Sequence, residues 1–134
     1  MKRMKVDATI YKGSDGFYTC YVEDELPGFI LSGYGETAEE AKADMLSVYE
    51  DIKELRAEEG KETIELDIVY KYDLQAFFNY FNWLNTTKVA EAAGVNPSLM
   101  RQYSSGVAKA GEKQYEKIRT AINKMSTDLY RARL

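Results

Sequence analysis

The chain has 134 residues, of which 45% are hydrophobic, and a formal net charge of −4. This length allows one ordinary domain or two small ones. The sequence contains no run of ~18 apolar residues, so it predicts no membrane span. The sequence holds no histidine and one cysteine, Cys20. This composition excludes Ser-His and Cys-His catalysis, histidine metal sites and an internal disulfide, so we expect a reducing, cytoplasmic environment.

The first half of the chain predicts three strands, one long helix and a fourth strand. Alternating apolar and polar residues indicate half-buried strands, and a Gly-Ser-Asp-Gly turn at residues 13–16 separates the first two. Thr37 and Glu40 form a capping box at the start of an amphipathic helix, and Gly60 ends it. The predicted elements are strands at 5–12, 17–22 and 29–34, a helix at 37–58 and a strand at 63–69, in the order βββαβ.

Three stretches of this half carry a family resemblance: Gly16-Phe17-Tyr18, residues 23–28 (EDELPG) and residues 33–41 (GYGETAEEA). With them, residues 5–70 resemble the HicB-type antitoxin domain. The family pattern has a loop ending Asp-Leu-Pro-Gly-Cys and a helix start of the form Gly-x-Thr-x-Glu-Glu-Ala. Here Glu25 stands in place of the aspartate and Phe29 in place of the cysteine.

The resemblance implies a partial ribonuclease-H-like fold with no nuclease activity of its own. It also implies that this domain covers the active site of HicA, a small basic toxin that cleaves mRNA. HicB antitoxins commonly carry a C-terminal DNA-binding domain and repress their own operon as oligomers. We expect the toxin-facing surface at the acidic loop, with the contact residues Glu23, Asp24, Glu25 and Leu26. The alternative is that this loop is simply solvated.

A helix over residues 74–84 follows, capped by Asp73 and rich in aromatic residues. Its predicted inward face is Leu74, Phe77, Phe78, Phe81 and Leu84. The alternative is an aromatic platform that stacks on single-stranded nucleic acid. A packed core is favoured, because no Lys or Arg lies between Asp73 and Thr87.

Residues 86–106 have the pattern of a helix-turn-helix. Thr86 or Thr87 can cap a first helix, Gly94 suits a left-handed turn, and Val95 would plug the corner. Asn96 and Pro97 suit the start of a second helix. The register resembles the helix-turn-helix of phage repressors, which places its second helix in the DNA major groove. The alternative is a helical hairpin that serves stability alone.

The resemblance to phage repressors assigns the contact residues. Base contacts would come from the start of the second helix, and backbone phosphates would be met by polar residues around the motif. The predicted base contacts are Pro97, Ser98 and Arg101, with Asn96 and Gln102 beside them. The predicted phosphate contacts are Thr86, Thr87, Ser105 and Lys109. Arg101 is the central prediction, because a guanidinium can bind both acceptors of guanine together.

The charges divide unevenly between the two halves. Residues 1–72 hold 9 Lys and Arg against 17 Asp and Glu, a net charge of −8. Residues 73–134 hold 9 against 5, a net charge of +4. Such asymmetry indicates a nucleic-acid-binding part in the basic half, whereas the acidic half would repel DNA and attract a basic protein.

A last helix over residues 112–134 offers one apolar face: Tyr115, Ile118, Ile122, Met125 and Leu129. This face either closes the helical domain or pairs with a second copy, and an edge strand of the first domain is a further dimer contact. Helix-turn-helix proteins usually bind paired half-sites as two-fold dimers, so we expect a homodimer or a higher oligomer.

Nothing in the sequence marks an enzyme. The carboxylates near the predicted strands lack metal-site spacing, and Gly33-Tyr34-Gly35 lacks the third glycine of a dinucleotide fingerprint. We therefore expect no catalytic residue, metal or cofactor. The prediction is an α+β protein with a HicB-like domain at 1–71 and an all-α helix-turn-helix domain at 72–134. Its expected function is that of a DNA-binding antitoxin and autorepressor. The alternatives are an orphan regulator, whose first domain serves oligomerisation or another partner, and an adaptor whose helical half binds protein.

Overall fold

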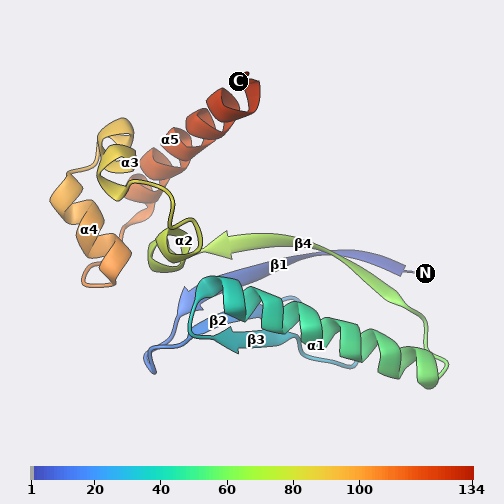
Figure 1. Ribbon diagram of the computed structural model, residues 1–134. Helices are drawn as coiled ribbons and strands as arrows, with labels where there is room; N and C mark the ends of the chain where they lie inside the picture. The colour runs from blue at the N-terminus through green and yellow to red at the C-terminus, as the bar shows by residue number, and fades with distance from the viewer. Residues whose placement is uncertain (1) are drawn as a thin grey trace. The chain divides into compact units, whose positions relative to one another are not determined.

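The computed structural model describes residues 2–134 and shows an α+β protein with a mixed four-stranded sheet and five helices (Figure 1). This confirms the predicted α+β class. In chain order, the strands β1 (Lys2–Lys12), β2 (Tyr18–Val22) and β3 (Ser32–Gly35) are followed by the helix α1 (Ala38–Glu58) and the strand β4 (Ile64–Tyr72). Successive strands β1, β2 and β3 pair antiparallel, and β4 pairs parallel with β1. The sheet order is β3-β2-β1-β4.

One face of the sheet packs against α1. Alternate residues of β1, such as Val6 and Ile10, are buried, as the period of two predicts. Gly33 on β3 leaves no room for a side chain, because a Cβ there would overlap the backbone of Ala41 and Met45 on α1. The helix therefore lies directly on the sheet backbone, and this close approach requires glycine at position 33.

The start of α1 confirms the predicted cap, with one difference. The Thr37 hydroxyl accepts from the Glu40 amide at 3.1 Å, as a capping residue does. The Glu40 carboxylate accepts from the Glu36 amide at 2.9 Å, and so reaches one residue further back than in the usual capping box. Both bonds fix the direction in which the chain enters the helix.

The helix after β4 is shorter than predicted and belongs to the first half. α2 spans Leu74–Tyr80 and buries Leu74, Ala76 and Phe78. The Asn79 side chain accepts from the amide of Ala38 at 2.8 Å, which ties α2 to the start of α1. The chain divides into two units at this point, Met1–Tyr80 and Phe81–Leu134, rather than after residue 71. The predicted aromatic face is thus divided between the two units. Phe81 begins the second unit and contacts Trp83 edge-on.

The second unit holds the three remaining helices, α3 (Thr86–Ala93), α4 (Pro97–Ser105) and α5 (Glu112–Arg131). α3 packs against both α4 and α5. The buried core of the second unit consists of Val89, Ala90, Val95, Met100, Tyr103, Ile118 and Ala121. The predicted apolar face of α5 is only partly buried here, since Leu129 is 64% exposed whereas Ile118 is 3% exposed. Across the described residues 2–134, no helix is long and apolar enough to cross a membrane.

Candidate nucleic-acid interface

The first helix of the motif, α3, is held at both ends by local bonds. The Asn85 side chain accepts from the Lys88 amide at 3.0 Å and caps α3, so the predicted caps, Thr86 and Thr87, lie inside the helix instead. Asparagine caps at least as well as threonine, which explains the shift by one residue. At the other end Gly94 is left-handed, with φ 71°, and the Val95 amide donates to the Ala90 carbonyl at 2.9 Å. Val95 is buried at the corner, as predicted.

The second helix, α4, starts at the predicted cap. The Asn96 side chain accepts from the amides of Ser98 at 2.8 Å and Leu99 at 3.2 Å, and Pro97 takes the first helical position. The side-chain oxygen of Asn96 therefore serves to position α4, and only its side-chain nitrogen is left for the predicted base contact. Inward-facing Met100 and Tyr103 are buried and hold α4 against the rest of the unit.

The predicted contact residues reach the surface to different degrees. Asn96, Ser98, Arg101, Gln102, Ser105 and Lys109 are exposed, whereas Thr86, Thr87 and Pro97 are half-buried. On α4, Ser98, Arg101, Gln102 and Ser105 recur at helical spacing and share the face opposite the buried side chains. This part of the prediction is thus brought together on one exposed helix face. Lys109 lies in the loop after α4, where the Ala108 amide donates to the Gln102 carbonyl at 3.2 Å.

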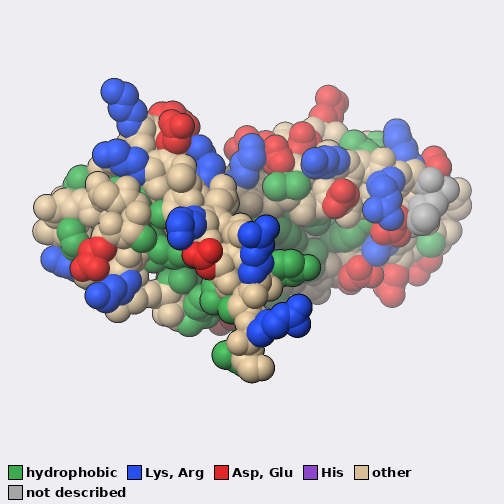
Figure 2. Space-filling view, turned by 90° about the horizontal axis from the view of Figure 1, so that it is seen from above, with side chains coloured by type: hydrophobic (Ala, Val, Ile, Leu, Met, Phe, Trp, Pro, Cys, Tyr) green, Lys and Arg blue, Asp and Glu red, His purple; other side chains and the backbone are tan. Residues whose placement is uncertain are grey.

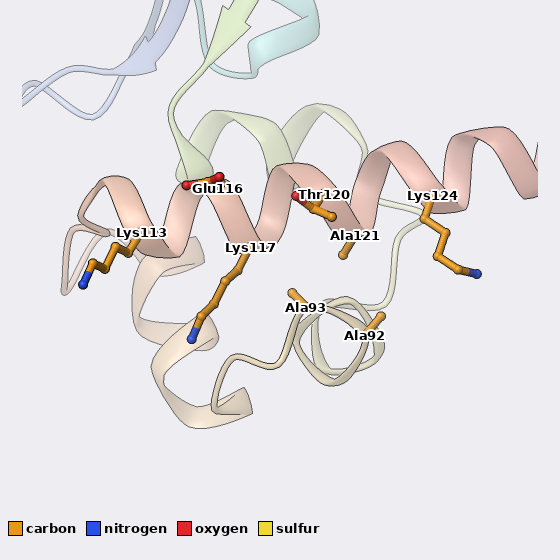
Figure 3. A pocket seen from close by; sticks show the side chains of 8 residues that line it. All are labelled: Ala92, Ala93, Lys113, Glu116, Lys117, Thr120, Ala121 and Lys124. Carbon is orange, nitrogen blue, oxygen red and sulfur yellow. The ribbon is translucent and has the colours of Figure 1, made fainter.

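A shallow groove of about 510 Å³, which the sequence did not predict, lies between α3 and α5 (Figure 3). Ala92 and Ala93 of α3 and Ala121 of α5 form its apolar floor, while Lys113, Lys117, Glu116, Thr120 and Lys124 surround it. The available signal was the recurrence of Lys113, Lys117 and Lys124 on one helix face. The groove lies at the end of α3 away from Thr86, so it is separate from the predicted DNA contacts of that helix.

The two units carry opposite net charge. Residues 81–134 hold 9 Lys and Arg and 4 Asp and Glu, whereas residues 1–80 hold 9 and 18, which gives net charges of +5 and −9. Figure 2 shows side chains of both signs at the surface. By net charge alone, a polyanion would be attracted by the second unit and repelled by the first.

The acidic loop of the first unit presents three of its four predicted contact residues. Glu23, Asp24 and Glu25 are exposed, but Leu26 is 7% exposed and packs in the core beneath the loop. Leu26 also lines a shallow pocket beside Glu25 and Pro27, and its role as a contact stays a prediction. The loop is tied down from two sides: the Asp24 carboxylate accepts from the Asp7 amide at 2.8 Å, and Arg56 donates to the Pro27 carbonyl at 3.1 Å.

No group of three or more His, Cys, Asp or Glu side chains that could hold a metal ion occurs within residues 2–134. Comparisons of the chain with protein-family models, with curated proteins and with solved structures find no match.

Proposed function

We propose that this chain is a cytoplasmic, non-catalytic DNA-binding repressor that inserts α4 into the major groove. One observation carries the proposal: α4 is capped by Asn96, anchored by buried Met100 and Tyr103, and lined on its outer face by exposed polar side chains. A helix that is rigid on one side and polar on the other is what base readout requires. The positive charge of the second unit supports the same conclusion, because phosphate contacts supply most of the affinity for DNA.

Arg101 tests this proposal directly. Arg101→Ala should weaken binding to a preferred duplex by about 1–3 kcal/mol and relax its sequence preference, since the guanidinium would no longer bind guanine. The preferred duplex is obtained by selection from a randomised pool. Arg119→Ala is the matched control, because Arg119 is an exposed arginine of α5 whose bridge to Glu112 spans 3.6 Å. The control should keep the selected sequence. An Arg101→Ala protein that selects the same sequence with unchanged affinity would refute the assignment.

We also propose that the first unit is a HicB-like antitoxin domain that neutralises a basic, HicA-like RNase. The net charge of −9 on residues 1–80 supports this, as does the exposed acidic loop, because a basic partner would be steered to both. Glu23 and Glu25 carry the test, since Asp24 is engaged with the Asp7 amide. Glu23→Lys with Glu25→Lys should abolish rescue from the product of a neighbouring small basic reading frame while leaving DNA binding intact.

The matched control for the antitoxin test is Glu58→Lys with Glu54→Lys, which makes the same charge change on exposed positions of α1. Rescue should survive in the control protein. Equal loss of rescue in both double variants would mean that net charge alone drives the association, and full rescue by both would remove the loop from the interface.

The second candidate is an orphan regulator whose first unit serves oligomerisation. The outer edge of β4 favours this candidate, because no strand among residues 2–134 pairs with it. A neighbouring reading frame that encodes no small basic protein would decide for the orphan regulator.

A further inference from the structure

β4 lies at one edge of the sheet and pairs with β1 alone (Figure 1). The direction of its main-chain groups follows from the bonds at its two ends. The Thr63 carbonyl accepts from the Lys2 amide, and the Asp73 amide donates to the Ile10 carbonyl, each at 3.1 Å. Odd-numbered residues of this strand therefore bond to β1. Even-numbered residues direct their N–H and C=O groups to the outer edge, since these directions alternate along a strand.

The first part of this outer edge is already covered. The Tyr49 hydroxyl of α1 donates to the Ile64 carbonyl and accepts from the Leu66 amide at 3.0 Å. Further along, Ile68 and Tyr70 direct their main-chain groups outward, and no strand among residues 2–134 pairs with them. An edge of this kind is a template for pairing with another chain.

We propose that β4 pairs antiparallel with β4 of a second copy, on a two-fold axis through Val69. Ile68 then lies opposite the partner's Tyr70, and the two residues exchange both main-chain hydrogen bonds, once on each side of the axis. Val69, which is 41% exposed, packs against the partner's Val69. Asp67 lies opposite the partner's Lys71, whose ammonium also lies 3.2 Å from the Asp7 carboxylate of its own chain, so unlike charges face each other twice.

The neighbouring registers are less favourable. An axis at Ile68 forms one Ile68–Ile68 pair and then needs the Leu66 amide, which already donates to the Tyr49 hydroxyl. The axis at Val69 forms two Ile68–Tyr70 pairs before it reaches Leu66. An axis at Asp67 places this carboxylate against its own copy, and an axis at Tyr70 places it against the partner's Asp73. The axis at Val69 pairs Ile68 with Tyr70 on both sides, places the exposed Val69 on the axis and sets Asp67 opposite Lys71.

The inference concerns the first unit alone and does not require that the second unit bind DNA. If it does bind DNA, the pairing brings two copies of α4 into one particle, as paired half-sites require. A partner of another sequence would not reproduce the self-complementary charges of Asp67 and Lys71, so we commit to a second copy of this chain.

Cysteine cross-linking of the full chain tests both the pairing and its register. Residues at a non-hydrogen-bonded antiparallel pair have Cα atoms about 4.5 Å apart, within the range that a disulfide spans. Val69→Cys should therefore give mostly covalent dimers when oxidised glutathione accepts the electrons of the two thiols. Asp67→Cys and Lys71→Cys should stay uncross-linked alone, because each lies about 13 Å from its own copy, yet should cross-link when mixed. The buried Cys20 thiol serves as the background in unmodified protein.

A charge variant tests the same pairing without oxidation. Val69→Lys places two ammonium groups together on the axis and should raise the dimer dissociation constant about tenfold or more, whereas Val69→Thr should leave it nearly unchanged. Light scattering at tens of micromolar reads the mass. Cross-linking of Val69→Cys no faster than that of Lys71→Cys alone would overturn the proposal. A Val69→Lys protein whose mass by light scattering equals that of the unmodified chain would also overturn it. That result would hold equally if a protein of another sequence pairs with this edge.

Discussion

Each of the two units of this protein is stabilised by a different kind of internal contact. The first unit depends on contacts between residues far apart in the chain, such as Gly33 of β3 beneath Ala41 and Met45 of α1, and on the pairing of β1 with β4. The second depends mostly on local devices, namely the caps Asn85 and Asn96 and the left-handed Gly94 and Gly106. The difference teaches that a small helical unit can be specified by its turns, whereas the sheet unit is specified by how closely its layers approach.

The largest effect is expected from a substitution that disrupts the close approach of β3 and α1 in the first unit. Gly33→Ala inserts a Cβ into the backbone of Ala41 and Met45, neither of which can move without shifting α1. We expect a loss of about 3 kcal/mol from the unfolding free energy of the first unit. Denaturant titration followed by far-UV circular dichroism measures this loss. Trp83, the single tryptophan, lies in the second unit, so its fluorescence transition should stay where it was.

Gly111→Ala is the control for this change. A Cβ at Gly111 meets no atom within 4 Å, and the position caps α5 without a side-chain bond. We expect a cost below about 1 kcal/mol, confined to the tryptophan transition. A Gly33→Ala protein in which the tryptophan transition moves together with the circular dichroism would show that the units unfold as one, and the comparison would fail.

The next effect concerns a single hydroxyl that joins α1 to β4. Tyr49 is 6% exposed, and its hydroxyl bonds to the carbonyl of Ile64 and the amide of Leu66. Tyr49→Phe leaves both main-chain groups without this partner, and we expect a loss of about 1–3 kcal/mol in thermal or chemical unfolding. Tyr11→Phe removes a hydroxyl from a partly exposed side chain and should change stability by less than about 0.5 kcal/mol. Equal effects of the two variants would contradict the role given to Tyr49.

A smaller effect sharpens the account of the second unit. Asn96→Ala removes the side-chain oxygen that accepts from Ser98 and Leu99, and should cost about 1 kcal/mol in the tryptophan transition. Ser98→Ala, two residues further along the chain, keeps the cap and should be nearly neutral for stability. If Asn96→Ala were as stable as Ser98→Ala, the local devices would not be what holds α4 in place.

The same difference decides what could be predicted from the sequence. The left-handed Gly94, the buried Val95 and the capping Asn96 were all predicted, because the conformation of a turn depends mainly on the residues in and beside it. The end of α2 and the boundary after Tyr80 were not, since they depend on Asn79 meeting Ala38, a contact between distant residues. The burial of Leu26 was not predicted for the same reason, because it depends on a core that the loop sequence does not reveal. The outward direction of Ile68 required the register of β1 and β4. The DNA, toxin and oligomer contacts remain predictions.

The smallest effect comes from alkaline pH and acts on the first unit. Burial raises the pKa of the Cys20 thiol to about 11 from an ordinary value of 9.0, against a smaller opposite effect of Lys42. Burial likewise raises the pKa of Tyr72 to about 12, helped by neighbouring Tyr80. The unfolded chain therefore loses these protons at lower pH than the folded chain, so the unfolding free energy is intact well below pH 9 and falls as the pH rises through 9 towards 12. At pH 9 the thiol contributes a loss of about 0.4 kcal/mol, because half of the unfolded chains are ionised there. Cys20→Ala should flatten the fall between pH 8 and pH 10 in the circular dichroism transition. An unchanged slope in Cys20→Ala would show that the thiol reaches water in the folded protein, and the tight packing assigned to this unit would have to be revised.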